Sequence, residues 1–511
     1  MTRKGRLTGN TDRVANVTPE LLEKSLEIPF NWISLTPKCL PPSFLVTAYN
    51  QLAQQMRTMT LATLPITGIN CVSSYYRDTE PNRLIAVRSL WRRSTNGFYY
   101  QHLNEDKPAP LFVPTVKVFI TLERNGKWGR KPEIISHYKM ACYIELAEHL
   151  SEKKELNAIP KEDCVLLLMD GVVFKIVIIH DEELQLQFSS AVEFQPHPQN
   201  REFTQNAHDA IVCRQLQGVA HRFNAFSETC QLVKRWLAAS KLSGHFDDMA
   251  LELLVGRCFL EPTDRSLFSG DNPETVISSF IQFLHLLATH NFLNEPCFVD
   301  VNENLKAEDR DEIRSKFLKS RPVLPCLCIS TPEDRAGVRY TRQGPESLVL
   351  CRTVKIAADS LAAIKSKALK NEQINFQALS VNDKSAYNLV IRLRRDRCTR
   401  YNQQEPENQK GKLQPEKSAI PAIDVDVTKW LFTLLQKELG EFALFFYDQF
   451  KPEKIFVVYR KNLLCPNDAT RSRALHKLKV QDVGVKLTDA FVQRIEYLGE
   501  GIVESIVEIK K

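Results

Sequence analysis

The pair Asp424 and Asp426 has the spacing of residues that could hold a divalent cation. Two carboxylates at alternate residues of one strand point to the same side and can hold magnesium against the phosphates of a nucleotide. Here, however, a helical pattern begins at Thr428, and no phosphate-binding glycine loop precedes the pair. We therefore expect these aspartates at a helix N-terminus, where they satisfy free amides and the helix dipole.

Two other groupings of metal-ligating residue types have plainer interpretations. His180 and Asp181 end a predicted strand beside two glutamates, and no second strand offers a carboxylate pair, so we interpret them as a solvated turn. Glu145 and His149 lie one helical turn apart, but a metal site would need further ligands that the sequence does not supply. We expect them on an exposed helix face, and we predict no metal ion and no cofactor.

The sequence also lacks the local motifs of common catalytic sites. It contains no Gly-x-Ser-x-Gly elbow, no phosphate loop of the Gly-Lys-Ser type and no His-Glu-x-x-His string. These absences remove the specific reasons to propose an enzyme. The balance favours a binding or architectural protein without a small-molecule substrate.

A run of arginines is the best local signal for contact with nucleic acid; it comprises Arg392, Arg394, Arg395, Arg397 and Arg400. The run follows the end of a predicted strand, and strand alternation would leave Arg392 and Arg394 on the outer side. Guanidinium groups there can clamp phosphates bidentately and release counterions, which gives salt-sensitive binding with little sequence preference. Solvation of a sheet edge is the competing interpretation, because no interleaved aromatic residues supply stacking platforms.

A second basic run lies in a predicted helix and comprises Arg471, Arg473, Lys477 and Lys479. It could meet RNA or an acidic protein, or it could line an ordinary exposed helix. The net charge of +7 is modest for 511 residues, so composition permits a nucleic-acid partner without demanding one.

The thirteen cysteines indicate a reducing compartment such as the cytosol or nucleus. They are scattered, no Cys-x-x-Cys occurs, and Cys326 and Cys328 are the closest pair, so neither a zinc site nor a disulfide framework is indicated. No apolar run has the length needed to cross a bilayer, and the N-terminus lacks the hydrophobic stretch of a signal peptide. We expect neither secretion nor a membrane partner.

The elements that would position these residues form three predicted domains after residues 1–42, which we interpret as a tail or an incomplete domain edge. Residues 43–200 read as α/β: helices near 43–59 and 133–150, strands near 66–75 and 116–122, and a hairpin at 165–179 that turns at Asp170 and Gly171. Residues 201–369 have apolar residues at helical spacing, which predicts a mostly helical domain with Trp236 in its core. One helix is predicted to end at Gly244, and another is predicted to start at residues 331–334. Residues 370–511 read as a second α/β domain, with strands at 388–393, 442–446 and 455–459 and a helix at 427–439. In it, residues 401–418 are almost free of apolar side chains and are predicted to be a mobile insertion.

Six segments distributed along the chain resemble one family; they span residues 126–128, 170–174, 234–246, 329–334, 387–393 and 443–448. The family is Nrap, the nucleolar RNA-associated proteins of the small-subunit processome. Its members usually have six domains, arranged as two units similar to nucleotidyltransferases of the CCA-adding and poly(A) polymerase type. This chain resembles the last three domains. The resemblance implies an α/β nucleotidyltransferase-like domain, a helical domain like those of poly(A) polymerase and oligoadenylate synthetase, and a second α/β domain.

The resemblance also allows a test for catalysis. The strand expected to carry the metal-binding carboxylate pair has valine or lysine at the alternate positions of residues 116–123, and residues 68–74 contain no Gly-Ser pair to cradle a triphosphate. This favours a retained fold without its reaction, as the resemblance itself implies.

Together these observations favour a non-catalytic scaffold that holds precursor ribosomal RNA and processome proteins in the nucleolus. An active RNA nucleotidyltransferase or nucleotide-binding protein is the alternative. A third possibility is a regulatory or inactive fragment, because the start of the chain suggests a truncation or a short paralogue.

Overall fold

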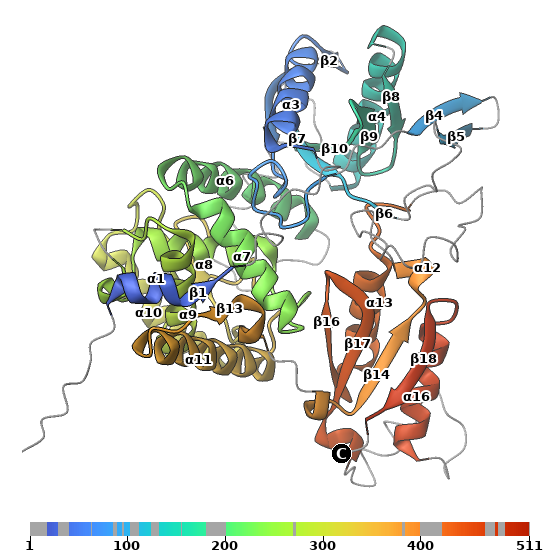
Figure 1. Ribbon diagram of the computed structural model, residues 1–511. Helices are drawn as coiled ribbons and strands as arrows, with labels where there is room; N and C mark the ends of the chain where they lie inside the picture. The colour runs from blue at the N-terminus through green and yellow to red at the C-terminus, as the bar shows by residue number, and fades with distance from the viewer. Residues whose placement is uncertain are drawn as a thin grey trace, which may run out of the picture.

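The computed structural model describes residues 18–28, 40–62, 64–84, 89–94, 97–102, 112–123, 132–154, 156–179, 201–268, 272–380, 384–398, 422–464, 476–478 and 486–509. Within these ranges the chain forms a first α/β domain, a helical domain and a C-terminal α/β domain (Figure 1). The predicted fold class is therefore confirmed. No helix in these ranges combines the length and apolar character needed to cross a bilayer.

The first α/β domain is built on a six-stranded sheet in the order β2-β3-β7-β10-β9-β8. Neighbouring strands are antiparallel except β7 and β10, which run parallel. The elements are α3 (Pro42–Met56), β2 (Thr60–Leu61), β3 (Leu64–Cys71), β4 (Ser89–Ser94), β5 (Gly97–His102), β6 (Phe112–Val113), β7 (Val116–Leu122), α4 (Pro132–Lys154), β8 (Asn157–Pro160), β9 (Val165–Met169) and β10 (Val172–Ile179).

Helices α3 and α4 cover one face of this sheet, because their apolar side chains share a core with alternate residues of β3, β7 and β10. The turn between β9 and β10 has φ of +50° at Asp170 and +78° at Gly171, as a two-residue hairpin requires. The predicted hairpin and the two predicted helices are confirmed.

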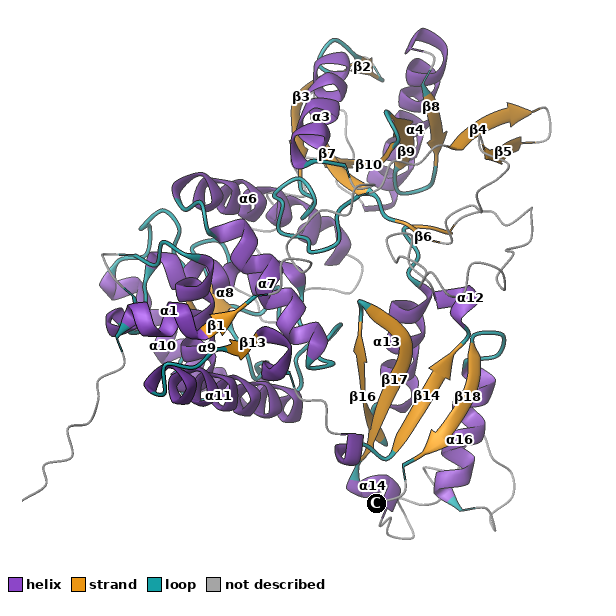
Figure 2. Cartoon of the chain, in the orientation of Figure 1, coloured by secondary structure: helices purple, strands orange, loops and turns teal. Residues whose placement is uncertain are grey.

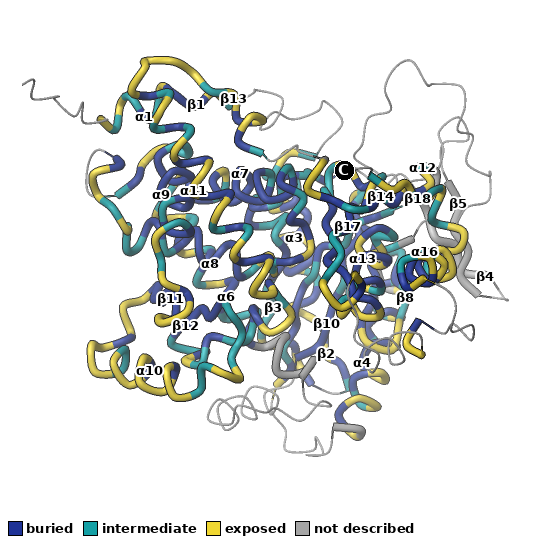
Figure 3. The backbone as a smooth tube through the Cα atoms, turned by 90° about the horizontal axis from the view of Figure 1, so that it is seen from below, coloured by how far each residue is buried: buried dark blue, intermediate teal, exposed yellow. Residues whose placement is uncertain are grey.

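Among the described residues, the helical domain forms the largest core, in which Trp236 is completely buried as predicted. Its outlying helix α10 is mostly exposed (Figure 3). The elements are α6 (Arg201–Arg222), α7 (Phe226–Ala239), α8 (Asp248–Leu260), η2 (Arg265–Leu267), α9 (Val276–Thr289), β11 (Cys297–Phe298), α10 (Ala307–Ser320), η3 (Arg321–Val323), β12 (Ile329–Ser330), α11 (Ser347–Leu369), β13 (Ile374–Asn375) and η4 (Phe376–Leu379). Phe376 and Leu379 belong to this core, so the domain extends beyond residue 369.

An N-terminal segment completes the helical domain. Helix α1 (Pro19–Ser25) lies against α9 and α11 (Figure 1). Leu22 and Leu26 are buried in the core. Strand β1 (Leu26–Glu27) pairs in parallel with β13. The described part of the predicted tail is therefore a component of this domain.

Two predicted helix boundaries in this domain are wrong. Helix α7 ends at Ala239, five residues before Gly244, and the first residue with left-handed geometry after it is Lys241, with φ of +63°. No helix starts at residues 331–334. There, Thr331 Oγ1 accepts from the Asp334 amide at 3.0 Å, so the polar side chains satisfy a turn rather than a first helical turn.

The C-terminal α/β domain is a four-stranded antiparallel sheet in the order β16-β17-β14-β18, with α13 and α16 on one face (Figure 2). Its elements are η5 (Lys384–Ala386), β14 (Leu389–Leu393), α12 (Arg395–Cys398), β15 (Ala422–Ile423), α13 (Val427–Leu439), β16 (Ala443–Asp448), β17 (Lys451–Tyr459), α14 (Lys461–Leu464), α16 (Leu487–Leu498) and β18 (Val503–Glu508). The three predicted strands and the predicted helix are confirmed. The predicted insertion at 401–418 lies outside the described residues.

Candidate functional site

Strand β7 is the strand that the sequence analysis tested for a carboxylate pair, and it contains no carboxylate. One face of the strand packs under α3 and α4. On the opposite face Phe119 is buried together with Cys213 of α6, and Lys117 Nζ lies 4.9 Å from the centroid of the Phe119 ring. The strand therefore presents an aromatic ring and an ammonium group toward the helical domain, where magnesium would need oxygen ligands.

The close packing of β3 against β7 explains why residue 68 is a glycine. The pairing of β3 with β7 shifts register between Ile66 and Gly68, and a Cβ at position 68 would lie 2.4 Å from Oγ1 of Thr121. Residues 68–71 are the end of β3, and a turn follows them. The glycine allows the two strands to approach closely.

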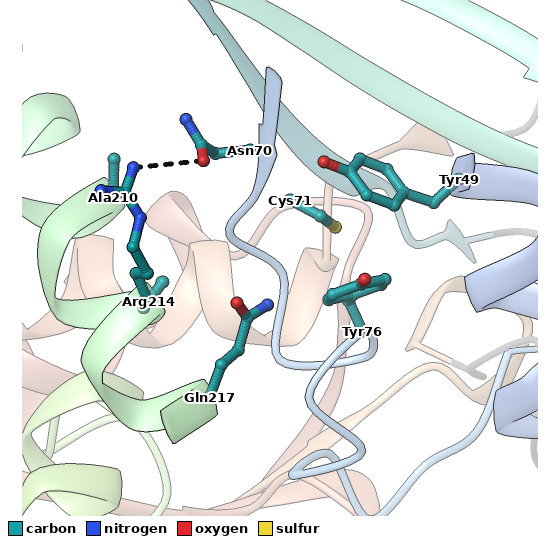
Figure 4. A pocket seen from close by; sticks show the side chains of 8 residues that line it. Tyr49, Asn70, Cys71, Tyr76, Ala210, Arg214 and Gln217 are labelled. Carbon is teal, nitrogen blue, oxygen red and sulfur yellow. Dashed lines mark hydrogen bonds between the residues drawn. The ribbon is translucent and has the colours of Figure 1, made fainter. Parts of the chain in front are cut away.

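A pocket of about 70 Å³ lies between the end of β3 and α6 (Figure 4). It is lined by Tyr49, Asn70, Cys71, Tyr76, Ala210, Cys213, Arg214 and Gln217. Arg214 donates to Asn70 Oδ1 at 3.3 Å, which links the two walls, and burial raises the pKa of both Tyr49 and Cys71 to about 12. Small-molecule sites usually enclose about 300–1,000 Å³. This pocket has room for water but not for a nucleoside triphosphate.

Beside the pocket, a buried ionic cluster joins the first α/β domain to the helical domain. Glu252 of α8 lies between Arg77, whose Nη2 is 2.8 Å from Oε2, and Lys234 of α7, whose Nζ is 3.1 Å from Oε1. Thr79 also donates to Glu252 Oε1, at 2.6 Å. All four side chains are buried. We name Arg77, Thr79, Lys234 and Glu252 the ionic cluster.

The ionic cluster fixes the charge state of Glu252. Burial raises the pKa of this carboxyl, but the charges of Arg77 and Lys234 outweigh burial and lower the pKa to about 2. Lys234 is also within 4 Å of Glu80 and Asp248, and these carboxylates together with Glu252 raise the pKa of Lys234 despite its burial. The charges on both sides of the domain joint are thus satisfied by one another and are not available to a ligand.

The segment after α7 joins the helical domain to the C-terminal α/β domain. The amide of Ser243 donates to Tyr447 O at 3.3 Å, and His245 Nε2 lies 2.9 Å from Phe445 O, so the segment binds along the edge strand β16. Gly244 has φ of +78°, and a Cβ there would lie 2.7 Å from the Phe432 ring. Residues 234–246, one of the six segments that resemble the family, therefore include a contact between two domains.

We expect Gly244→Ala to lower the free energy of unfolding by about 1–3 kcal/mol, because it adds left-handed strain to a clash with Phe432. Urea unfolding checks this value. Gly218→Ala is the control, since it lies in α6 with open space around its Cβ position and alanine favours helix. A loss at position 244 no larger than at position 218 would contradict the steric argument.

The aspartates at 424 and 426 have separate partners. Asp426 is the N-cap of α13 and accepts from the amides of Thr428 and Lys429 at 3.0 and 3.1 Å, as predicted. Asp424 has φ of +61°, and its Oδ2 lies 3.5 Å from Nζ of Lys175 in β10. This contact lies next to the parallel pairing of β15 with β6, so it links the first and last domains.

Within the described ranges no cluster of three His, Cys, Asp or Glu side chains could hold a metal ion, and Glu145 and His149 lie within these ranges. Glu145 is not simply on an exposed helix face, because its Oε2 accepts from the amide of Ala62 at 2.6 Å. His149 is half-buried. His180 and Asp181 lie outside the described residues.

The arginine run does not form one surface. Arg392 is exposed on the sheet face opposite α13, directly across from Lys454 of β17. Arg394 and Arg397 are exposed at the strand end and on α12, whereas Arg395 lies 3.3 Å from Glu453 in an ion pair. Arg400 is outside the described residues.

The second basic run is largely outside the described residues, because Arg471, Arg473 and Lys479 fall there. Lys477 is described, and its ammonium pairs with Glu441. Among the described residues of the two runs, Arg392, Arg394 and Arg397 are exposed, whereas Arg395 and Lys477 form ion pairs.

Sequence reasoning missed the partner of Arg392. Lys454 lies 62 positions further on in the chain, and only the antiparallel register places it opposite Arg392. It also missed a second aspartate pair with alternate spacing, Asp309 and Asp311. These lie in α10, where they form ion pairs with Arg335 and Arg314.

Three family models match this chain in consecutive order. Residues 42–228 match Nrap protein nucleotidyltransferase domain 4, residues 223–382 match Nrap protein PAP/OAS1-like domain 5, and residues 384–506 match Nrap protein domain 6. Nucleolar protein 6 of Xenopus laevis is 26% identical over 490 residues, which cover 90% of this chain and 42% of the relative. Nucleolar protein 6 of Homo sapiens is 28% identical over 418 residues, with 78% and 36% covered.

The chain thus spans less than half the length of these curated relatives. Among solved structures, a crystal structure of the Cid1 poly(U) polymerase is similar, with a TM-score of 0.34 and 12% identity. The match covers 66% of this chain and 92% of that chain.

Proposed function

The chain belongs to the Nrap family, with domains 4, 5 and 6 in order, and we propose that it is a non-catalytic scaffold that binds precursor ribosomal RNA and processome proteins. Its relatives are nucleolar proteins by name, and its location is the nucleus and nucleolus. The scaffold would act in the assembly of the small ribosomal subunit.

The closed joint between the first two domains supports the absence of catalysis. Phe119 and Lys117 occupy the face of β7 that would hold metal ions, and the adjacent pocket of about 70 Å³ is too small for a nucleotide. The ionic cluster joins the domains beside this pocket. A polymerase would need room there for a nucleotide and for the end of an RNA strand.

The juxtaposition of Arg392 and Lys454 is the observation that carries the proposal of RNA binding. The two residues are directly opposite on neighbouring strands, both are exposed, and neither forms an ion pair with another residue of the described ranges. Like charges in this position destabilise a sheet. Two successive phosphates of an RNA strand, one beside each side chain, would neutralise both side chains and release counterions.

We expect the double substitution Arg392→Gln with Lys454→Gln to weaken binding of an unstructured RNA about tenfold at physiological salt. The slope of the logarithm of affinity against the logarithm of salt concentration should fall by about 1.4, since each lost phosphate contact removes about 0.7. Fluorescence anisotropy of a labelled oligouridylate measures both quantities. The free energy of unfolding should stay level or rise slightly, because a like-charge pair is removed.

The matched control is Lys319→Gln with Lys355→Gln, which removes two exposed charges from α10 and α11 of the helical domain. Equal weakening in both double variants would mean that only net charge matters. Incubation with nucleoside triphosphates, Mg²⁺ and an RNA primer tests the enzymatic alternative. Nucleotide incorporation that is lost on changing Asp424 and Asp426 to alanine would overturn the non-catalytic proposal.

A further inference from the structure

The outward side of α13 carries an exposed tryptophan between two lysines. Lys429, Thr433 and Lys437 follow one another at intervals of four residues, and Trp430 lies on the same side, three residues before Thr433 and seven before Lys437. All four side chains are exposed. Trp430 is 51% exposed, whereas Trp236 is completely buried. We name these four residues the α13 stripe.

The α13 stripe has an uncompensated positive charge. Glu438 and Glu441, near the end of the helix, are paired with Arg494 and Lys477. Asp426, at the start of the helix, accepts from its first-turn amides. Neither Lys429 nor Lys437 forms an ion pair with any residue that the structure describes.

The α13 stripe lies close to the arginines of α12. Helix α12 contacts α13 (Figure 2). Cys398 of α12 is buried in the core to which the inward side of α13 contributes. Arg397 is exposed on α12, which follows β14 and therefore Arg392. Basic residues thus extend from Arg392, which is exposed on the sheet, past the end of the sheet, to the outward side of α13.

We propose that the α13 stripe is a binding platform for single-stranded RNA, in which a base stacks on the indole of Trp430 and the flanking phosphates contact Lys429 and Lys437. The two lysines are separated by about 12 Å along the helix, which accommodates the phosphates on either side of a stacked nucleotide. Duplex RNA is excluded because its bases are already stacked on one another. The proposal rests on the proposed RNA-binding function and assigns a second surface to it.

Charge decides between RNA and a protein as the occupant. Tryptophan is common at protein interfaces, but lysine is depleted there. An exposed aromatic ring flanked by cations is instead the arrangement that binds single strands with little sequence preference. The stripe supplies the stacking surface that the arginine run itself lacks.

The test is fluorescence anisotropy of labelled oligouridylate with the full chain, using a duplex RNA of equal length as the second probe. Trp430→Ala should weaken binding of the single strand about 10- to 100-fold and leave duplex binding nearly unchanged, whereas Trp430→Phe should retain most of the affinity because a ring remains. Lys429→Gln with Lys437→Gln should lower the salt slope by about 1.4. In the wild type, the single strand should quench tryptophan fluorescence.

Tyr497→Ala is the matched control, because Tyr497 is 67% exposed in the same domain but stacks with Arg494 on α16. Unchanged RNA affinity in Trp430→Ala, with binding still sensitive to Arg392→Gln and Lys454→Gln, would overturn the platform and leave the proposed function standing. Absence of RNA binding by the wild type would overturn both. Loss of a co-purified protein from Trp430→Ala, with RNA affinity intact, would make the stripe a protein interface and overturn the platform.

Discussion

Glu252→Ala is expected to lower the free energy of unfolding by about 3–5 kcal/mol, which is the cost of leaving buried charges without their partner. Glu252 is the nearest counter-ion of both Arg77 and Lys234, and it also accepts from Thr79. Its removal leaves two cations and a hydroxyl group buried at a domain joint. Urea unfolding at neutral pH, followed by far-ultraviolet circular dichroism, measures the loss.

Replacing the whole ionic cluster separates its ionic role from its packing. Arg77→Met, Lys234→Met and Glu252→Leu together should cost less than Glu252→Ala alone, because no charged group of the ionic cluster then stays buried without its partner. The control Glu312→Ala removes an exposed ion pair to Lys316 and should barely change stability. If Glu252→Ala were no more destabilising than Glu312→Ala, the ionic cluster would not be what joins the domains.

Glu252 also predicts behaviour in acid. The pKa of this carboxyl is about 2 in the folded chain and about 4.5 when unfolded, so the folded state favours the charged form. Its contribution to stability is fully present above pH 4.5 and is lost as the pH falls toward 2. Any weakening of the protein above pH 5 must therefore come from other groups.

Local features of the fold were predictable because neighbouring residues determine them. The Asp170-Gly171 turn and the N-cap at Asp426 each follow from residue types that suit a particular backbone geometry. The end of α7 was misplaced because Gly244 suits a left-handed position in a loop as well as at a helix end. At position 244 the close approach of Phe432, which is remote in sequence, requires a residue without a Cβ.

The candidate surfaces were less predictable because they depend on contacts between distant segments. Arg77 and Glu252 are 175 positions apart, and no local pattern relates them. Arg392 acquires its neighbour Lys454 only through strand register. The α13 stripe is different, since the spacing of Lys429, Trp430 and Lys437 was readable in a correctly predicted helix. The sequence did not show which side of that helix packs into the core. The structure shows that the packed side leaves Trp430 outside the core.

Lowering the pH from 7 to 5 is expected to destabilise the protein through two buried, neutral histidines. Burial lowers the pKa of His208 to about 3 and that of His245 to about 4, while an unfolded histidine titrates near 6.5. Because the unfolded chain binds protons first, stability is lost as the pH falls below 6.5. At pH 5 each histidine contributes a loss of about 2 kcal/mol.

The hydrogen bonds explain why neither ring accepts a second proton. His245 Nε2 donates to Phe445 O, and its Nδ1 accepts from Gln436, so a proton on Nδ1 would face a donor. Tyr340 donates to Asp209, which leaves its oxygen to accept from His208 Nδ1 at 2.9 Å. His208 Nε2 is buried without a partner in the described structure, so a proton there would have no acceptor.

Asp247 opposes this trend, because burial raises the pKa of its carboxyl to about 6 and the folded state gains a proton in the same range. That gain offsets about 1 kcal/mol of the loss at pH 5.

Single substitutions isolate each histidine: His245→Gln and His208→Gln should each flatten the decline of unfolding free energy between pH 7 and 5. His137→Gln, on the exposed side of α4, is the control and should leave the decline unchanged. A decline that persists in the double variant would assign the acid sensitivity to groups other than these two rings, because the proton uptake by the unfolded chain would then have another source.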